Sequence, residues 1–158
     1  MKLLQSALLI IFLQCVPAVA ETHSNAYVLV APGVVTGSGL SGPVVELALG
    51  GEAVFAKTFG LGVEVGGFAL DKRVDSGFGI ASVAGYYHFS RSDSKFDPFV
   101  TGGYSAVIPS GSSLANFGAG VNWWFAPHLG VKFVFRDYLY SGDGQVNLAS
   151  FGVGLLFH

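Results

Sequence analysis

The chain has 158 residues and a formal net charge of −2, with 51% hydrophobic and only 11% charged residues. Globular chains carry about 25% charged residues, and a chain without a basic excess is not expected to bind nucleic acid. The single cysteine, Cys15, excludes a fold that is held together by disulfides.

The first 20 residues have the order of a secretory signal peptide. A positive charge at Lys2 is followed by an apolar run and then by Ala18 and Ala20, small residues at the two positions that a signal peptidase reads. The apolar run is shorter than the ~20 residues that a membrane-spanning helix needs. We therefore predict a cleaved signal peptide at 1–20 and one mature domain at 21–158.

The remainder of the chain is predicted to form strands. Glycine, with 23 residues, interrupts every apolar stretch, and glycine disfavours helices. Most of the expected strands are long enough to cross an outer membrane, which takes about 9–11 tilted residues. Eight strands are predicted at 25–35, 44–55, 59–70, 77–89, 96–108, 114–125, 129–140 and 146–157.

The segments between these strands alternate in character. Polar or glycine-rich connectors fall at 36–43, 71–76, 109–113 and 141–145. The others fall at 56–58, 90–95 and 126–128. With both termini in the periplasm, the first group lies outside the cell and the second inside. Outer-membrane barrels have short periplasmic turns and longer external loops, and the modest loops here predict little external apparatus.

Period-two alternation is clearest in the last three predicted strands. In the last one, bulky apolar residues at 151, 153, 155 and 157 share one face, and residues 150, 152 and 154 on the other face are small. This pattern is typical of a barrel in lipid, with its apolar face outward. In lipid, only helices and closed barrels pair all their backbone polar groups. The predicted fold is all-β, an eight-stranded antiparallel up-and-down transmembrane β-barrel.

Aromatic residues gather where the strands meet the second group of connectors. Aromatic rings favour the headgroup level of a bilayer, and barrels carry a girdle of them at each interface. An ordinary aromatic core is the alternative, since aromatic residues are common in strands. The girdle is predicted to contain Phe55, Phe59, Phe89, Trp123, Phe125 and Phe157, with Phe96 and Phe99 nearby and Tyr104, Tyr138 and Tyr140 toward the opposite end.

Carried through all the strands, the alternation places a set of charged residues on the inward face. They are Glu46, Glu52, Glu64, His88, Lys132 and Arg136. An eight-stranded barrel is just wide enough for side chains to fill it, and a charge cut off from water must be paired. We therefore expect the glutamates to reach Lys132 or Arg136 across the interior. Such a network would fill and fix the interior or, as the alternative, form a narrow gated ion path.

Four segments carry a family resemblance: 85–89 (GYYHF), 96–104 (FDPFVTGGY), 117–121 (FGAGV) and 136–139 (RDYL). In this order they resemble the small outer-membrane β-barrel family, which includes the OmpA transmembrane domain and OmpX-like proteins. The resemblance covers the whole mature chain. It implies a place in the cell outer membrane, contact with outer-membrane lipid, and interior ion pairs like those discussed as a gate in OmpA-like proteins.

The last predicted strand resembles the signal by which the barrel-assembly machinery recognises members of this family. The resemblance assigns Ser150, Gly152, Leu155 and Phe157 to that signal and implies the machinery as a partner during biogenesis. The chain departs from the pattern because His158 follows the terminal aromatic residue and because Ser150 is a small choice for the polar position.

Candidate catalytic chemistry is confined to His88-Phe89-Ser90. This triplet resembles the His-x-Ser of a lipid A deacylase that is itself an eight-stranded outer-membrane barrel, and a serine nucleophile needs an adjacent base. The triplet lies at the periplasmic end, however, whereas lipid A lies in the outer leaflet. No catalytic residue is therefore expected. Histidines 23, 88, 128 and 158 are scattered along the sequence, and common nucleotide- and metal-binding motifs are missing, so neither a cofactor nor a metal is expected.

These observations predict an outer-membrane protein with a structural, envelope or surface-interaction role, no wide pore and no enzymatic activity. Its external partner is unknown. The first alternative is a soluble exported ligand-binding barrel of the lipocalin or avidin kind, although 11% charge is little for its surface. A lipid-modifying enzyme and a narrow gated channel are the remaining alternatives.

Overall fold

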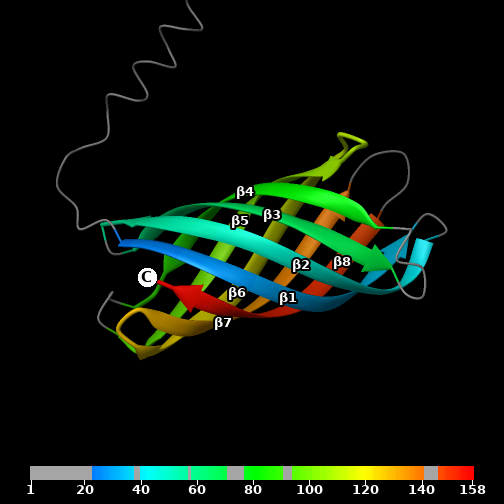
Figure 1. Cartoon of the computed structure of the whole chain (residues 1–158). Coiled ribbons are helices and arrows are strands. Elements are labelled where there is room, and N and C mark those ends of the chain that lie inside the picture. The colour runs from blue at the N-terminus through cyan, green and yellow to red at the C-terminus, as the bar shows by residue number, and fades with distance from the viewer. Residues whose placement is uncertain (1–22, 38–39, 57, 71–76, 91–93, 141–145) are drawn as a thin grey trace, which may run out of the picture.

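The computed structural model describes residues 23–37, 40–56, 58–70, 77–90, 94–140 and 146–158 (Figure 1). Within these ranges, no helix has the length and apolarity that crossing a membrane requires. The strands are β1 (His23–Gly37), β2 (Leu40–Phe55), β3 (Phe59–Leu70), β4 (Phe78–His88), β5 (Phe96–Ile108), β6 (Ser113–Ala126), β7 (Leu129–Tyr140) and β8 (Val146–Phe157).

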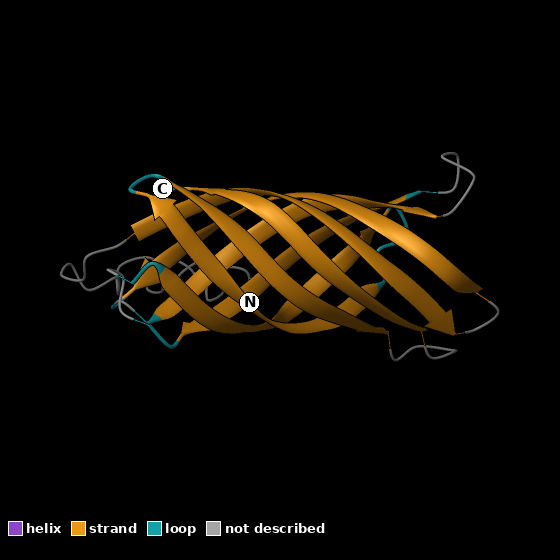
Figure 2. Ribbon diagram, turned by 90° about the horizontal axis from the view of Figure 1, so that it is seen from below, coloured by secondary structure: helices purple, strands orange, loops and turns teal. Residues whose placement is uncertain are grey.

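The eight strands form one closed antiparallel barrel, and this confirms the predicted fold class. Each strand pairs with its neighbour in sequence, and β8 pairs back with β1 to close the sheet. The strands run obliquely around the barrel (Figure 2). We call the end where β1 begins and β8 ends the terminal end, and the opposite end the far end. The predicted signal peptide at 1–20 lies outside the described residues and stays a prediction.

The predicted connector at 36–43 is mostly strand, which corrects the expected loop. Thr36 pairs with Ser41 and Gly37 with Leu40, so both β1 and β2 extend into the segment. Pro43 fits within β2 because β3 pairs with β2 only from Val44 onward. At Pro43, β2 is therefore paired on one side only. Proline has no N–H to donate to a ladder, and it is tolerated where a strand has a single neighbour.

The other predicted bounds agree closely with the structure. The segments predicted at 59–70, 96–108, 129–140 and 146–157 coincide with β3, β5, β7 and β8. β4 is one residue shorter at each end than predicted and β6 one residue longer at each end. The predicted connectors at 71–76 and 141–145 lie outside the described residues.

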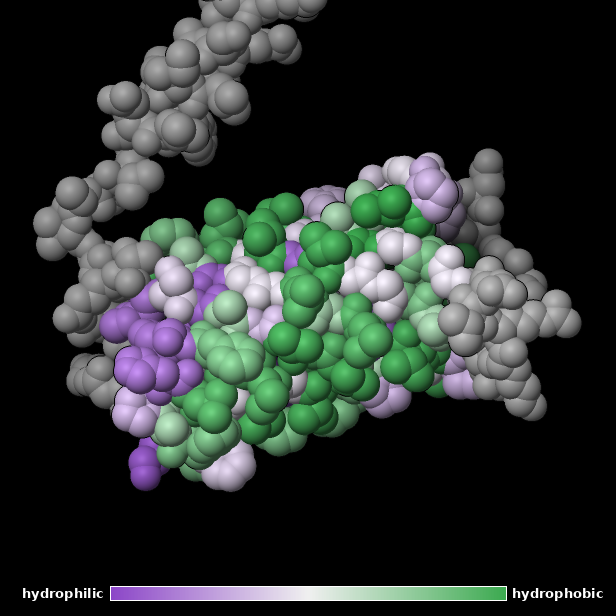
Figure 3. All heavy atoms as spheres, viewed as in Figure 1, coloured by the Kyte–Doolittle hydropathy of each residue, from purple (hydrophilic) through white to green (hydrophobic). Residues whose placement is uncertain are grey.

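The outward face of the barrel is apolar. Along β8, side chains are alternately exposed and buried, with Phe151 and Leu155 outward and Leu156 inward. Leu47 and Val63, near the middles of β2 and β3, are each 61% exposed. Figure 3 shows apolar side chains over much of one flank and hydrophilic ones toward the terminal end. Soluble monomers rarely expose apolar patches larger than a few hundred Å², so this surface suits lipid.

The inward face packs into two apolar clusters. One contains Tyr27, Leu29, Ala31, Ala48, Ala84, Tyr86, Phe99, Val134 and Leu156. The other, toward the far end, contains Val35, Val44, Phe68, Ile80, Tyr138 and Leu148. Large rings fit because glycines face them, and a Cβ atom at Gly50 would overlap the ring of Tyr27. The charged side chains of the interior lie among these two clusters.

Candidate functional site

The six charged residues predicted to face inward are all buried in the barrel. Each is at most 5% exposed. They come from four strands: Glu46 and Glu52 from β2, Glu64 from β3, His88 from β4, and Lys132 and Arg136 from β7. Alternation places them on the inward face, and barrel closure brings these strands within reach of one another. They form two linked groups, one around Arg136 and one around His88 and Lys132.

Arg136 is the centre of the first group. Its Nη1 donates hydrogen bonds to Glu64 Oε1 and, at 2.9 Å, to the hydroxyl of Tyr138. The Tyr138 hydroxyl donates to Glu46 Oε1 at 3.1 Å, and the Tyr27 hydroxyl donates to Glu64 Oε2 at 2.8 Å. These contacts offset the cost of removing the charged groups from water. They also connect β1, β2, β3 and β7 across the interior.

His88 bridges two carboxylates in the second group. Its Nδ1 lies 2.7 Å from Asp97 Oδ2, and its Nε2 lies 2.6 Å from Glu52 Oε1. Both ring nitrogens can donate together only when the ring is an imidazolium. The amide of Asn122 donates to the same Asp97 oxygen at 3.2 Å. Both nitrogens of His88 are therefore engaged by acidic side chains.

Lys132 lies fully buried in an aromatic cage. Its Nζ is 4.7 Å from the ring centroid of Tyr27, 5.1 Å from that of Tyr86 and 4.2 Å from that of Phe99. Cation–π attraction operates at these distances. Glu52 Oε2 lies 3.8 Å away. Among the described residues Lys132 has no hydrogen-bond partner, so the rings and one carboxylate hold the ammonium group.

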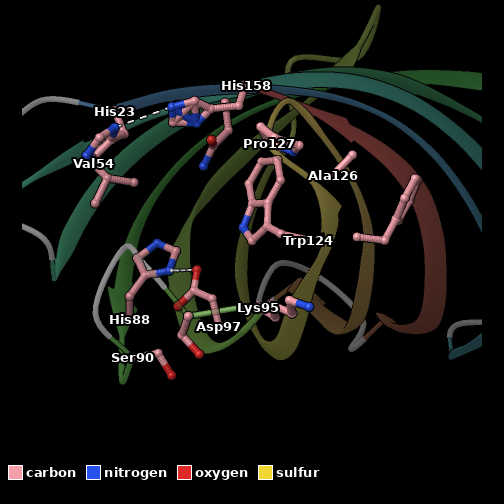
Figure 4. A pocket seen from close by; sticks show the side chains of 13 residues that line it. His23, Val54, His88, Ser90, Lys95, Asp97, Trp124, Ala126, Pro127 and His158 are labelled. Atoms are coloured by element: carbon pink, nitrogen blue, oxygen red, sulfur yellow. Dashed lines mark hydrogen bonds and ion pairs between the residues drawn. The ribbon is translucent and has the colours of Figure 1, made fainter.

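The terminal end of the barrel opens into a cavity of about 450 Å³ (Figure 4). We call this cavity the vestibule. His88 and Asp97 line it together with Trp124, Lys95 and Ser90. A deeper cavity beside Glu64 and Arg136 holds only about 10 Å³, roughly the space of one water molecule. This deeper cavity has no room for more than a single small molecule.

Three histidines meet at the rim of the vestibule, and this corrects the expectation that the histidines are scattered. His23 Nδ1 lies 3.3 Å from His158 Nε2, and the rings of His128 and His158 lie 6.4 Å apart. Closure brings the start of β1, the turn between β6 and β7 and the end of β8 to one rim. Partial burial, and then repulsion from His23 and His128, lower the pKa of His158. Within the described segments, no group of three or more His, Cys, Asp or Glu side chains is arranged to hold a metal ion.

The predicted girdle residues lie on the outer surface near the terminal end. Phe55, Phe59, Phe89, Trp123, Phe125 and Phe157 are between 39% and 62% exposed. The ring of Tyr87 contacts those of Phe59 and Phe89, at 5.4 and 5.1 Å. Trp123 stacks on Phe96 and meets Phe125 edge-on, each at 6.1 Å. These two aromatic series give the outer surface the ring-rich band that a lipid interface favours.

Phe99 and Tyr138 are exceptions to the predicted girdle. Each is 1% exposed and points inward. The alternation of β5 and β7 places them there, and Gly120 leaves room for the Phe99 ring, since a Cβ atom at Gly120 would lie only 2.6 Å from its Cζ. Asp97 lies two residues before Phe99 in the same strand and therefore also faces inward. Asp97 was not among the predicted site residues. The inward aromatics Tyr27 and Tyr86 were likewise not predicted.

The four residues assigned to the assembly signal alternate across β8. Ser150 is 3% exposed and lies opposite Arg136 in the ladder. Gly152 faces inward against Leu29. Leu155 and Phe157 are 51% and 42% exposed on the outer face. Recognition of this strand by the assembly machinery stays a prediction.

Comparison with known proteins shows the fold and no closer relationship. No family model matches the sequence, and no curated protein matches it. Neisserial surface protein A superposes with a TM-score of 0.67 at 13% identity, covering 87% of this chain and 99% of that one. Ail of Yersinia pestis, solved with the heparin analogue sucrose octasulfate, gives 0.58 at 17%, covering 87% and 100%. The outer membrane enzyme PagL gives 0.52 at 17%, covering 84% and 99%. The chain has the fold of the small outer-membrane β-barrels, in agreement with the predicted location in the outer membrane.

Proposed function

We propose that the protein is an integral outer-membrane barrel with a structural or surface-interaction role and a filled, non-conducting interior. The observation that carries the proposal is the inside-out distribution of polarity. Val63 and Val65 on the outer face are each 61% exposed, whereas Lys132 and Glu46 inside are fully buried. A soluble ligand-binding barrel needs the opposite arrangement, with its apolar face around the ligand. Lipid is the solvent that matches this surface.

The interior network acts in this proposal as a plug. The Lys132 cage lies a few residues in from the terminal end of the strands, and Arg136, paired with Glu64, lies four residues further along β7. Aqueous channels belong to barrels with many more strands, and eight strands leave a lumen that side chains fill. The deeper cavity of about 10 Å³ agrees with this packing.

Catalysis by His88 and Ser90 is not part of the proposal. A catalytic histidine needs a free nitrogen that takes the proton of the nucleophile. Both nitrogens of His88 already face the carboxylates of Glu52 and Asp97. PagL is an enzyme with this fold, so lipid A from cells with and without the gene is the direct test. We expect the lipid A to be identical, and a change that Ser90→Ala abolishes would contradict the non-enzymatic role.

The membrane proposal is tested by electrophoresis of purified outer membranes, boiled and unboiled. A closed barrel resists detergent until it is heated, so we expect the unboiled protein to migrate differently from the boiled one. A periplasmic protein without a mobility shift would exclude the membrane proposal and favour a soluble barrel.

A further inference from the structure

A pair of histidines spans the seam between the first and last strands. The ladder between β1 and β8 reaches the terminal end at Ala26, which pairs with Phe157. Beyond that pair, His23 from β1 and His158 after β8 face each other, with 3.3 Å between Nδ1 and Nε2 (Figure 4). Their side chains therefore hold the two strands together where the backbone ladder has ended.

The separation of the two nitrogens suits a shared metal ion. Tetrahedral zinc binds imidazole at about 2.0–2.1 Å, which places two such ligand atoms about 3.4 Å apart. A single N–H···N hydrogen bond between neutral rings gives a similar distance and is the competing explanation. The two explanations differ in what happens when metal is supplied.

The His158 ring is positioned by its neighbours before any metal arrives. The indole of Trp124 meets the His158 ring edge-on, with centroids 5.7 Å apart and planes at 80°. The backbone N–H of His158 donates to the carbonyl oxygen of His128 at 3.2 Å. A metal ligand must be a neutral imidazole, so the site binds metal only when both rings are deprotonated.

The vestibule supplies the remaining space that a metal would need. His23 and His158 both line this cavity of about 450 Å³, so water or a ligand can fill the other coordination positions. Imidazole suits Zn²⁺, Cu²⁺ and Ni²⁺, whereas Mg²⁺ and Ca²⁺ prefer oxygen ligands. We propose that His23 and His158 form a two-histidine site for an imidazole-preferring divalent transition metal, which clasps the first strand of the barrel to the last.

Zinc titration of the untagged protein, purified in a non-ionic detergent and freed of metal, tests the site. We expect one Zn²⁺ per chain by calorimetry. Loss of a group that only hydrogen-bonds to a metal ligand already costs about 10–100-fold in metal affinity, so His23→Gln and His158→Gln should each weaken binding by at least about tenfold. His128→Gln is the matched control, because it removes a histidine at the same rim that does not belong to the pair, and its affinity should match the wild type.

Thermal stability is a second readout, and it distinguishes a bound metal from a hydrogen bond between the two histidines. A ligand that binds only the folded state raises stability, so Zn²⁺ should raise the temperature of the gel-mobility transition in the wild type and in His128→Gln. Either variant of the pair should need at least about tenfold more Zn²⁺ for the same rise. The transition measured in chelator shows that each variant folds, and His23→Ala and His158→Ala replace any glutamine variant that does not.

Three results would overturn the proposal. The first is the absence of 1:1 binding up to about millimolar Zn²⁺. The second is unchanged affinity in either variant of the pair. The third is a loss of affinity in His128→Gln equal to that in His23→Gln. None of these results bears on whether the barrel lies in the membrane or conducts ions.

Discussion

Arg136 is the residue on which the interior hydrogen bonds converge, because it contacts Glu64 directly and reaches Glu46 through the Tyr138 hydroxyl. Removing one partner of a buried ion pair leaves an uncompensated charge and costs about 3–5 kcal/mol. Replacing both partners with neutral groups costs much less. The pair therefore contributes to stability mainly by keeping each charge satisfied.

We expect Arg136→Met to lower the free energy of unfolding by about 3–5 kcal/mol, because Glu64 loses its cation. The double variant Arg136→Met/Glu64→Gln should recover a large part of that loss. Urea unfolding in lipid vesicles measures both. Lys95→Met, which removes an exposed cation, is the control and should change stability by less than about 0.5 kcal/mol. A double variant as unstable as the sum of the single variants would show that the two residues are not coupled.

Gly50 and Gly51 are adjacent, yet we expect alanine to destabilise the barrel at Gly50 much more than at Gly51. A Cβ atom at Gly50 would overlap the Tyr27 ring, whereas at Gly51 the nearest atom is a backbone oxygen at 3.4 Å. Overpacking in a filled interior costs about 1–3 kcal/mol, so Gly50→Ala should destabilise the barrel by that amount and Gly51→Ala by much less. Equal effects in the same unfolding assay would show that the Tyr27 ring can move aside.

At the scale of the strand, the outer face of β3 presents a depth series. Val63 lies near the middle of the strand and Phe59 at its start, and they are 61% and 60% exposed. An arginine on a lipid face costs about 2–4 kcal/mol at the bilayer midplane and about 0–1 kcal/mol near the interface. Val63→Arg should therefore cost clearly more than Phe59→Arg in vesicle unfolding. Equal, small costs would indicate that this face is in water.

Alternation was enough to predict β3, β5, β7 and β8 and the inward direction of the six charged residues. It failed at 36–43, where glycine and serine suggested a loop although both strands continue to pair there. Residue type alone also misplaced Phe99, because an aromatic residue suits both a girdle and a core. The lysine cage and the histidine rim depend on which strands meet after closure, and no single segment contains that information.

At the scale of the whole molecule, the barrel opens at the vestibule, and the proposed function requires that side chains block the passage beyond it. The ring centroids of Tyr86 and Phe99 lie 5.1 and 4.2 Å from Lys132 Nζ, and these rings are the candidates for this block. We expect no stable channel from the wild type in planar bilayers, and small conductance steps from Tyr86→Ala/Phe99→Ala. Phe135→Ala, which removes an outward ring that is 48% exposed, is the control and should stay silent. Steady wild-type conductance equal to that of the double variant would show that the cage does not block ions.

The cross-barrel hydrogen bonds also bear on how the chain folds. Glu64 and Arg136 are 72 residues apart, and Glu46 and Tyr138 are 92 apart. Contacts between residues distant in sequence slow folding, because a long loop must close before they form. Until β7 arrives, Glu46 and Glu64 face the nascent interior without their basic partner, and the edges of the sheet are unpaired. A half-inserted barrel therefore carries two free-energy costs, one from the unpaired carboxylates and one from the unpaired sheet edges. Strand insertion and closure should consequently proceed as one slow cooperative event.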